Sequence, residues 1–240
     1  MSRHRPGPGP GYFFLKRGFD VAISSIALLL ASPLLACAAL AVKLGSPGPV
    51  FYRARRAGLY GRPFRMLKFR TMRHESDAPD RRITSERDER ITAVGAWLRK
   101  TKLDELPQLW NVLRGDMSIV GPRPEDWDLV QRHYTPAQLR SLDTRPGIAC
   151  EAEVRWYPDL TFHDPAPPGV SAQDHYVRRH MPAQVREALR YVDERSFGRD
   201  LSILLRTAWC VAFHTFVPQT RRPLDEGDGL QRGEAAEAGA

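Results

Sequence analysis

Two adjacent carboxylates, Asp104 and Glu105, stand directly after a basic run, residues 99–102, at the start of a segment with helical periodicity. An aspartate at a helix N-cap and a glutamate in the first turn are ordinary features, and each stabilises a helix by about 0.3–1 kcal/mol. The same residue types can also do chemistry, because a carboxylate can act as a nucleophile or help to hold Mg²⁺. The pair taken alone leaves both interpretations open.

Basic side chains elsewhere in the chain could complete a phosphate-handling site around this pair. Lys68 and Arg70 lie on a predicted basic strand, and Arg123 lies in a rigid loop between two prolines. A transferring phosphoryl group spreads negative charge over its oxygens, so its chemistry needs several cations and N–H groups. Phosphate chemistry, commonly with Mg²⁺, is therefore a candidate function, although composition alone does not prove it.

The charge of the chain narrows the class of partner. Lys and Arg total 36 against 28 Asp and Glu, which gives a net charge of +8 and favours polyanionic partners. The most basic stretch, residues 53–73, contains no acid and adjoins an apolar segment. Basic chains beside a membrane segment usually meet anionic lipid or phosphate, so we expect an anionic membrane surface as a partner and no nucleic acid.

Several short elements must position these residues. The sequence predicts strands at residues 50–52 and 64–69, joined by a turn at 58–63. A helical pattern covers residues 92–100, and a second helix has Pro107 in its first turn and ends at Gly115. This second helix would place Asp104 at or near its N-cap.

An apolar segment near the N-terminus is long enough to enter a membrane. Residues 21–42 are uncharged, and about 20 such residues span a bilayer as a helix. A buried core helix and a cleavable signal peptide are the alternatives. Ser32-Pro33 interrupts the run, and proline kinks a helix because it lacks the N–H group. The serine hydroxyl can bind the carbonyl that the proline leaves free.

Basic residues flank this segment on both sides. Lys16 and Arg17 precede it, while Lys43 and Arg53 follow it, so the positive-inside tendency would keep both ends in the cytoplasm. A helix that breaks halfway can enter and leave a membrane by the same face. We therefore expect a re-entrant hairpin, with a kinked single span as the alternative.

The chain resembles the bacterial sugar transferase family, the monotopic phosphoglycosyl transferases that use a polyprenyl phosphate. Any one matching motif is weak, but residues 104–108 (Asp-Glu-Leu-Pro-Gln) and 120–124 (Val-Gly-Pro-Arg-Pro) at this spacing are highly specific. The other motifs, in the family's order, are residues 16–20, 32–33, 46–51, 68–72, 98–103, 111–118 and 145–148, with 196–207 similar to the family's terminal helix.

The resemblance implies a mechanism with two steps. Asp104 would attack the sugar-linked phosphorus of a UDP-sugar and release UMP, and a polyprenyl phosphate such as undecaprenyl phosphate would then take the phosphosugar. Mg²⁺ would be held at Asp104, and Glu105 would assist as a metal or acceptor partner. Four cations would bind phosphates: Lys68, Arg70, Arg99 and Arg123. Residues 149–152 depart from the commonest branch of the family, so the sugar stays open.

The expected fold is α+β and mainly helical, with a re-entrant membrane helix and a small cytosolic α/β catalytic domain with amphipathic surface helices. The expected boundaries are a disordered arm (1–11), the membrane helix (12–44), the catalytic domain (45–218) and a disordered tail (219–240). The enzyme would work at the cytoplasmic face of the bacterial inner membrane, in an oligomeric state that the sequence leaves undecided. A catalytically silent scaffold of the same fold, or a glycosyltransferase that releases UDP, is the alternative.

Overall fold

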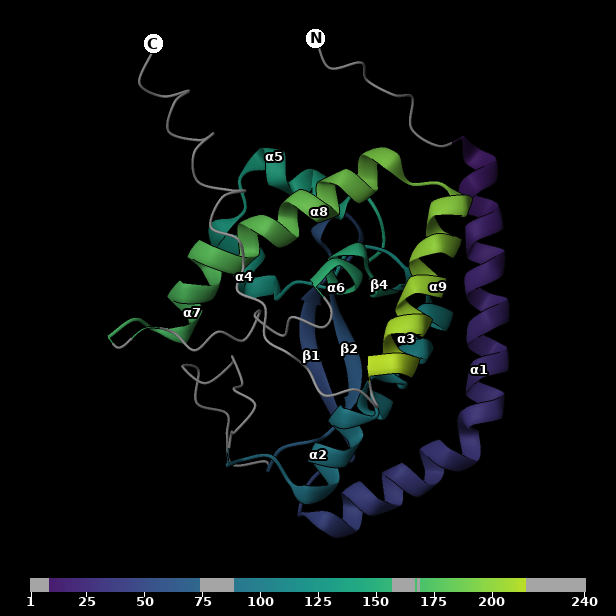
Figure 1. The fold of residues 1–240 in the computed structure, drawn as a ribbon, viewed down its shortest axis with the longest axis vertical. Coiled ribbons are helices and arrows are strands. Elements are labelled where there is room, and N and C mark those ends of the chain that lie inside the picture. The colour runs from purple at the N-terminus through teal and green to yellow at the C-terminus, as the bar shows by residue number, and fades with distance from the viewer. Residues whose placement is uncertain (1–8, 74–88, 157–166, 168, 215–240) are drawn as a thin grey trace.

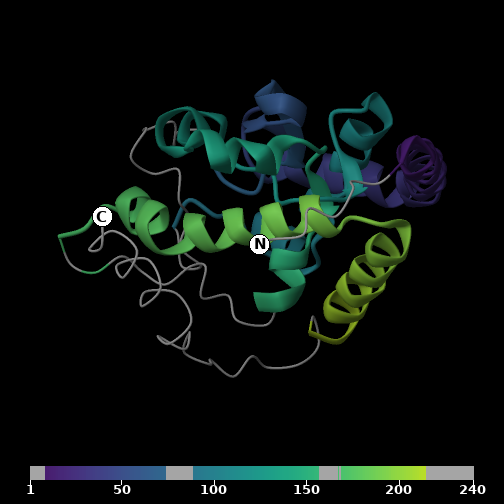
Figure 2. The same ribbon diagram turned by 90° about the horizontal axis from the view of Figure 1, so that it is seen from above.

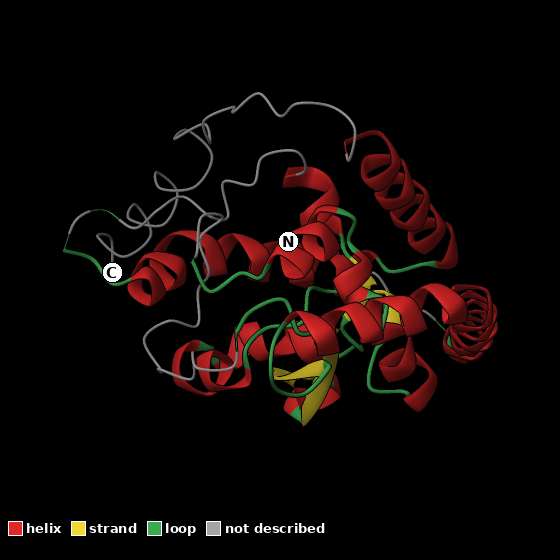
Figure 3. Ribbon diagram, turned by 90° about the horizontal axis from the view of Figure 1, so that it is seen from below, coloured by secondary structure: helices red, strands yellow, loops and turns green. Residues whose placement is uncertain are grey.

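The computed structural model describes residues 9–73, 89–156, 167 and 169–214, and helices dominate this part of the chain (Figure 1, Figure 2 and Figure 3). The predicted tail, 219–240, and most of the predicted arm, 1–11, lie outside the described residues. The elements are α1 (Pro10–Gly45), β1 (Phe51–Ala57), η1 (Leu59–Gly61), β2 (Pro63–Phe69), α2 (Ala93–Lys100), η3 (Leu103–Glu105), α3 (Gln108–Arg114), β3 (Ser118–Val120), α4 (Trp127–His133), α5 (Pro136–Leu139), η4 (Arg140–Leu142), β4 (Gly147–Ala149), α6 (Glu151–Trp156), α7 (Ala172–His175), η6 (Tyr176–His180), α8 (Met181–Glu194) and α9 (Phe197–His214).

The predicted class is confirmed at this level: a long apolar N-terminal helix precedes a mainly helical domain that contains small sheets. The predicted hairpin is also confirmed, since β1 and β2 pair antiparallel from Phe51↔Phe69 to Ala57↔Pro63. Strand β1 is longer than the apolar run 50–52 suggested, because it continues through residues 53–57, where Arg53 and Arg55 are exposed and Ala54 and Ala57 are buried. The hairpin therefore carries much of the basic stretch.

The second sheet joins two motifs that are far apart in the sequence. Strands β3 and β4 pair in parallel, with Val120 opposite Ala149. A Cβ atom on Gly147 would lie 2.0 Å from the backbone nitrogen of Gly121, and one on Gly121 would lie 2.4 Å from the Arg145 carbonyl oxygen. The two backbones approach so closely that neither glycine could carry a side chain. This contact fixes the start of the loop that carries Arg123.

Helix α3 ends as predicted, because Gly115 adopts the left-handed conformation with φ 88° and caps it. Asp104 lies near the N-cap of α3, as predicted, but it is not the N-cap residue. Pro107 caps α3, and Asp104 lies one short turn earlier, in the 3₁₀ turn η3. The proline lacks a donor, so the chain closes an extra turn before the α-helical hydrogen bonds begin.

Helix α1 is one continuous helix of 36 residues that contains Pro33 and changes direction part-way along (Figure 1). The Ser32 hydroxyl donates a hydrogen bond of 2.8 Å to the Leu29 carbonyl oxygen. Leu29 is four residues before Pro33, so this is the carbonyl that the proline leaves without its helical donor. The predicted role of the serine is confirmed, while the re-entrant path through a bilayer stays a prediction.

Both halves of α1 pack on the domain through one face and leave the other face exposed. Ala27 and Leu28 contact the main core, while Ala38 and Val42 form a second cluster with Phe69 of β2 and Leu98 of α2. Of the described helices, α1 is the one long and apolar enough to cross a membrane. Its exposed apolar side chains include Phe14, Ile26, Leu29, Leu30, Leu40 and Leu44.

A buried set of polar groups, here called the anchor cluster, holds the start of α1 to β3 and α9. Its members are Tyr12, Lys16, Asp20, Ser118, Tyr191 and Asp200. The Lys16 ammonium lies 2.7 Å from the Asp200 carboxylate and donates to the Val120 carbonyl oxygen. The Asp20 carboxylate accepts hydrogen bonds from the Ser118 hydroxyl and the Ile119 N–H group. These charges lie inside the fold because each one has a partner.

Candidate active site

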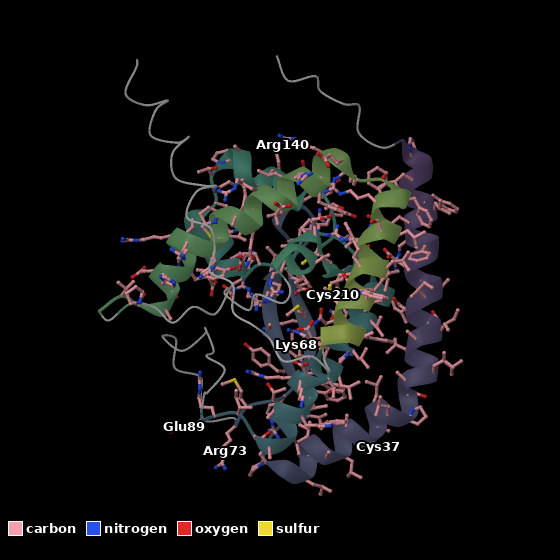
Figure 4. The ribbon with its side chains drawn as sticks, viewed as in Figure 1. Cys37, Lys68, Arg73, Glu89, Arg140 and Cys210 are labelled. Atoms are coloured by element: carbon pink, nitrogen blue, oxygen red, sulfur yellow. The ribbon has the colours of Figure 1, made fainter. Side chains whose placement is uncertain are left out.

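The open end of the β1–β2 hairpin meets the turn that carries Asp104 and Glu105. The fully buried Asn111 of α3 holds the two together. Its side-chain amide forms hydrogen bonds with the β2 backbone, as the backbone of a neighbouring strand would. Its oxygen accepts from the Leu67 N–H group at 2.9 Å and its nitrogen donates to the Arg65 carbonyl oxygen at 2.8 Å. Lys68, labelled in Figure 4, follows directly on β2, and its ammonium lies 2.8 Å from the Glu105 carboxylate in the turn η3.

The turn itself has an unusual backbone. Lys102, just before η3, adopts the left-handed conformation with φ 58°, which costs free energy for a residue with a Cβ atom. The Glu105 N–H group then donates to the Lys102 carbonyl oxygen at 3.3 Å. This sharp reversal after α2 turns the Asp104 side chain inward, where only 7% of the residue is exposed.

Glu105 is held in its ionised form. One of its carboxylate oxygens lies 2.8 Å from the Lys68 ammonium, and the other accepts from the Gln108 amide at 3.3 Å. Burial acts to raise the pKa of Glu105, but the nearby Lys68 and Lys102 charges outweigh it and lower the pKa to about 2. Glu105 is therefore an anion at any physiological pH, and it is already engaged by a cation.

Asp104 differs from Glu105 both in its hydrogen-bond partners and in the direction of its pKa shift. Among the residues that the structure describes, none donates a hydrogen bond to its carboxylate. Burial, and then the adjacent Glu105 charge, raise the pKa of Asp104 to about 6, against the opposing effect of Lys68, Lys102 and Arg99. Adjacent carboxylates with such different environments are typical of a site where the two groups have different tasks.

Two further predicted residues lie close enough to act on this pair. Arg99 donates to the Thr71 hydroxyl at 2.9 Å, and its charge favours ionised Asp104. Arg123 forms an ion pair with Glu153 of α6, and its charge favours ionised Glu105. The structure thus brings Lys68, Arg99 and Arg123 to the Asp104–Glu105 pair. We call these five residues the carboxylate cluster.

Arg70 does not belong to this cluster, and we drop it from the predicted phosphate-binding residues. Its guanidinium is buried and donates to the carbonyl oxygens of Pro47 at 2.6 Å and Ser46 at 2.7 Å. It also approaches the Val42 carbonyl oxygen at 3.3 Å. Arg70 therefore donates hydrogen bonds to the carbonyl groups at and just after the C-terminal end of α1, where the helix dipole favours a cation.

Sequence reasoning missed two charged members of the site. Lys102 has a strained backbone conformation, and its charge acts to lower the pKa of both carboxylates, although the pKa of Asp104 is raised overall. It lies in the basic run before Asp104. Glu153 pairs with Arg123 across 30 residues. The basic run could have pointed to Lys102, whereas no local pattern marks Glu153 as a partner of Arg123.

The donor set for a metal ion is small. No group of three or more His, Cys, Asp or Glu side chains comes together among the described residues. Mg²⁺ needs fewer protein ligands, since it is commonly held by one or two carboxylates, water and substrate phosphates. Asp104, whose carboxylate accepts no hydrogen bond from the part of the chain that the structure describes, fits this mode of binding.

Comparison with known proteins assigns the class. The model of the bacterial sugar transferase family matches residues 11–214. The chain is 40% identical over 208 residues to a UDP-glucose:undecaprenyl-phosphate glucose-1-phosphate transferase of Caulobacter vibrioides, covering 85% of this chain and 73% of the relative. An Escherichia coli K12 protein of the same description is 54% identical over 198 residues, 81% of this chain and 39% of the relative.

A third relative carries a different sugar in its description. A UDP-N-acetylgalactosamine-undecaprenyl-phosphate N-acetylgalactosaminephosphotransferase of Aeromonas hydrophila is 43% identical over 149 residues, 61% of this chain and 35% of the relative. The chain thus spans little more than a third of the length of this protein and of the E. coli one. The class that these matches define is an enzyme. The chain belongs to the bacterial sugar transferase family.

Proposed function

We propose that the protein transfers a sugar 1-phosphate from a UDP-sugar to undecaprenyl phosphate and releases UMP, as a first membrane step of polysaccharide or glycoconjugate synthesis. The observation that carries this proposal is the pair of unlike carboxylates: one is buried and accepts no hydrogen bond from the described residues, while the other is paired with Lys68. UDP-glucose is the first donor to test, because two relatives that cover over 80% of the chain are described as using it.

In the first step, a carboxylate oxygen of Asp104 attacks the phosphorus that carries the sugar. The bond from this phosphorus to the oxygen that bridges it to UMP breaks, and UMP leaves with the electron pair. In the second step, an oxygen of undecaprenyl phosphate attacks the same phosphorus and expels the Asp104 carboxylate. A nucleophile that no other group already binds is suited to this covalent route.

The cations of the cluster stabilise the charge that develops on the transferring phosphoryl group. Lys68, Arg99 and Arg123 lie around the carboxylate pair, where they can bind the phosphate oxygens of the donor. Glu105 keeps Lys68 in place through its ion pair. Arg123 exchanges Glu153 for a substrate phosphate, since both are anions that bind a guanidinium. Mg²⁺ held at Asp104 would neutralise further phosphate charge.

The exposed face of α1 supports a membrane location. Large apolar side chains cover this face, and α9 adds Leu205 and Trp209, each 62% exposed. Both ends of α1 pack on the same domain, which favours a helix that dips into one leaflet and returns over a helix that crosses. With basic residues at both ends, the domain would lie at the cytoplasmic face of the inner membrane.

The test is product identity together with trapping of the intermediate. Detergent-solubilised protein is incubated with Mg²⁺ and UDP-glucose labelled in the sugar, without lipid acceptor. We expect UMP release and label on the peptide that contains Asp104, and loss of the label when undecaprenyl phosphate is added. Asp104→Asn should abolish turnover, whereas the matched exposed variant Asp193→Asn should be as active as the wild type.

Three outcomes would overturn the proposal. UDP as the product would indicate a different glycosyltransferase reaction. Absence of UMP with every UDP-sugar tried would favour a silent scaffold. Consumption of the donor by Asp104→Asn at the wild-type rate would remove the proposed nucleophile.

A further inference from the structure

A hollow of about 460 Å³ lies at the opposite end of the β1–β2 hairpin from the carboxylate cluster. Lys68 is paired with Tyr52 at the open end of the hairpin, whereas this hollow lies beside Tyr60 in the turn η1. Its lining shares no residue with the carboxylate cluster, and its volume is in the range of sites for small molecules. The wall is strongly basic and comes from Lys16, Arg17, Arg145 and Arg195.

Two of these four cations already have their main partners. Lys16 is neutralised by Asp200 at 2.7 Å in the anchor cluster. Arg17 donates to the Val112 carbonyl oxygen at 2.6 Å and to the Leu113 carbonyl oxygen at 2.8 Å. Both side chains therefore shape the wall of the hollow, while their best donors point into the protein.

The other two arginines keep spare donors. Arg145 donates only its Nε–H group, to the Gly115 carbonyl oxygen at 2.8 Å, among the hydrogen bonds of the described residues. Arg195 donates one N–H group to the Asp143 carbonyl oxygen at 3.3 Å, and its buried Nε atom has no acceptor within the described structure. Each guanidinium therefore keeps further N–H groups that no acceptor in the described structure binds.

Two carboxylates also line the hollow. Asp20 is occupied by the Ser118 hydroxyl and the Ile119 N–H group, and it faces Arg17 and Lys16. Asp143 lies exposed at the rim. The lining as a whole carries four cationic and two acidic side chains, so an anion is favoured over a cation.

The position of the hollow indicates which class of anion it could bind. Phe13, in the second turn of α1, forms part of its wall, and the Arg195 guanidinium lies 5.3 Å from the centre of the Phe13 ring. The next residue, Phe14, is 86% exposed. An arginine pair beside exposed aromatic side chains at the start of a membrane helix lies at the depth of lipid phosphates.

We propose that this hollow binds a phosphate-bearing ligand through Arg145 and Arg195, with the phosphoglycerol head group of an anionic phospholipid as its source. The guanidinium groups supply paired N–H donors that suit phosphate oxygens. Free phosphate has the same chemistry and is the alternative source. The lipid source rests on the membrane location of α1 in the proposed function; binding of phosphate itself does not.

The experiment measures binding to the full chain in neutral detergent at constant ionic strength. The probes are dihexanoyl phosphatidylglycerol, dihexanoyl phosphatidylcholine and inorganic phosphate, each titrated calorimetrically. Arg195→Gln and Arg145→Gln should each weaken phosphatidylglycerol binding by about tenfold or more, because each removes a charge-assisted contact. Arg195→Lys should retain part of the affinity. Arg140→Gln, an exposed arginine on the neighbouring η4, is the matched control and should bind as the wild type does.

The probes separate the sources. Binding of phosphatidylglycerol over phosphatidylcholine supports the lipid, and binding of inorganic phosphate alone supports the free anion. Equal binding by the wild type and both glutamine variants would overturn the proposal.

Hydrogen exchange of the wild type provides a readout that needs no variant. Whichever of phosphatidylglycerol and inorganic phosphate binds should slow amide exchange around residues 143–147 and 195, and no protection there by either probe would also overturn the proposal. UMP release is assayed separately, so a failure of the transferase proposal leaves this result standing.

Discussion

The anchor cluster and the carboxylate cluster use the same kinds of side chain for opposite purposes. In the anchor cluster the Asp200 carboxylate meets Lys16 and the hydroxyl groups of Tyr12 and Tyr191, at 2.6–2.8 Å. In the carboxylate cluster Asp104 is as deeply buried, yet no described residue donates to it. The difference teaches that burial of a charge does not mark function. A functional site is marked instead by a buried carboxylate that no described residue binds, so that a substrate or a metal ion can bind it.

The largest expected effect comes from breaking the anchor cluster. Lys16→Met leaves the buried Asp200 without its cation, and loss of one partner of a buried pair typically costs about 3–5 kcal/mol of unfolding free energy. Thermal unfolding of the detergent-solubilised protein measures this loss. Lys43→Met, the same change at an exposed position of the same helix, is the control. Equal stability of the two variants would show that the anchor cluster does not hold α1.

A smaller effect, on activity, comes from the carboxylate cluster. Lys68→Ala removes both the partner of Glu105 and a phosphate-binding cation, so kcat/KM for UMP release should fall by roughly 10- to 150-fold, equivalent to about 1.5–3 kcal/mol. The control is Arg65→Ala, an exposed cation on the same strand, which should leave the rate unchanged. Equal losses in the two variants would assign the effect to the overall charge of the hairpin.

Removal of a buried carboxylate charge should change the unfolding free energy in opposite directions in the two clusters. The folded protein raises the pKa of Asp104 from 3.8 to about 6, so ionised Asp104 opposes folding above pH 6. Asp104→Asn should therefore raise the unfolding free energy at pH 8 by about 1–3 kcal/mol, and this gain should shrink below pH 6 and vanish only below the unfolded-state pKa of 3.8, where the wild-type carboxyl is protonated in both states.

This comparison is made with a chelator present, so that no metal ion contributes, and Asp193→Asn serves as the exposed control. Asp200→Asn in the anchor cluster should lower stability instead. A loss of stability in Asp104→Asn at every pH would show that Asp104 is a structural residue.

Much of the local structure followed from the sequence because it depends on short-range rules. The short run of residues 64–69 after a turn predicted β2, and Gly115 predicted the end of α3. Pro33 and Ser32 predicted a disturbed helix and the hydrogen bond that repairs it. Each of these outcomes is decided within four residues along the chain.

Lys68 and Arg70 show where such rules end. They are alternate residues along one edge of the chain and have the same charge, so the sequence assigned them the same task. Lys68 meets Glu105, 37 residues away, while Arg70 meets the last carbonyl groups of α1. Only the packing of α1 against the hairpin decides that Lys68 belongs to the site, whereas Arg70 stabilises the fold.

Patterns in the sequence were enough to predict the β1–β2 hairpin, the end of α3, the motif that carries Asp104 and Glu105, and the basic character of their surroundings. Tertiary structure decided which carboxylate is free, which cations reach it, and that a second arginine pair surrounds a separate hollow. The physical reason is that hydrogen bonding along the chain is local, whereas desolvation and charge pairing depend on groups that only folding brings together.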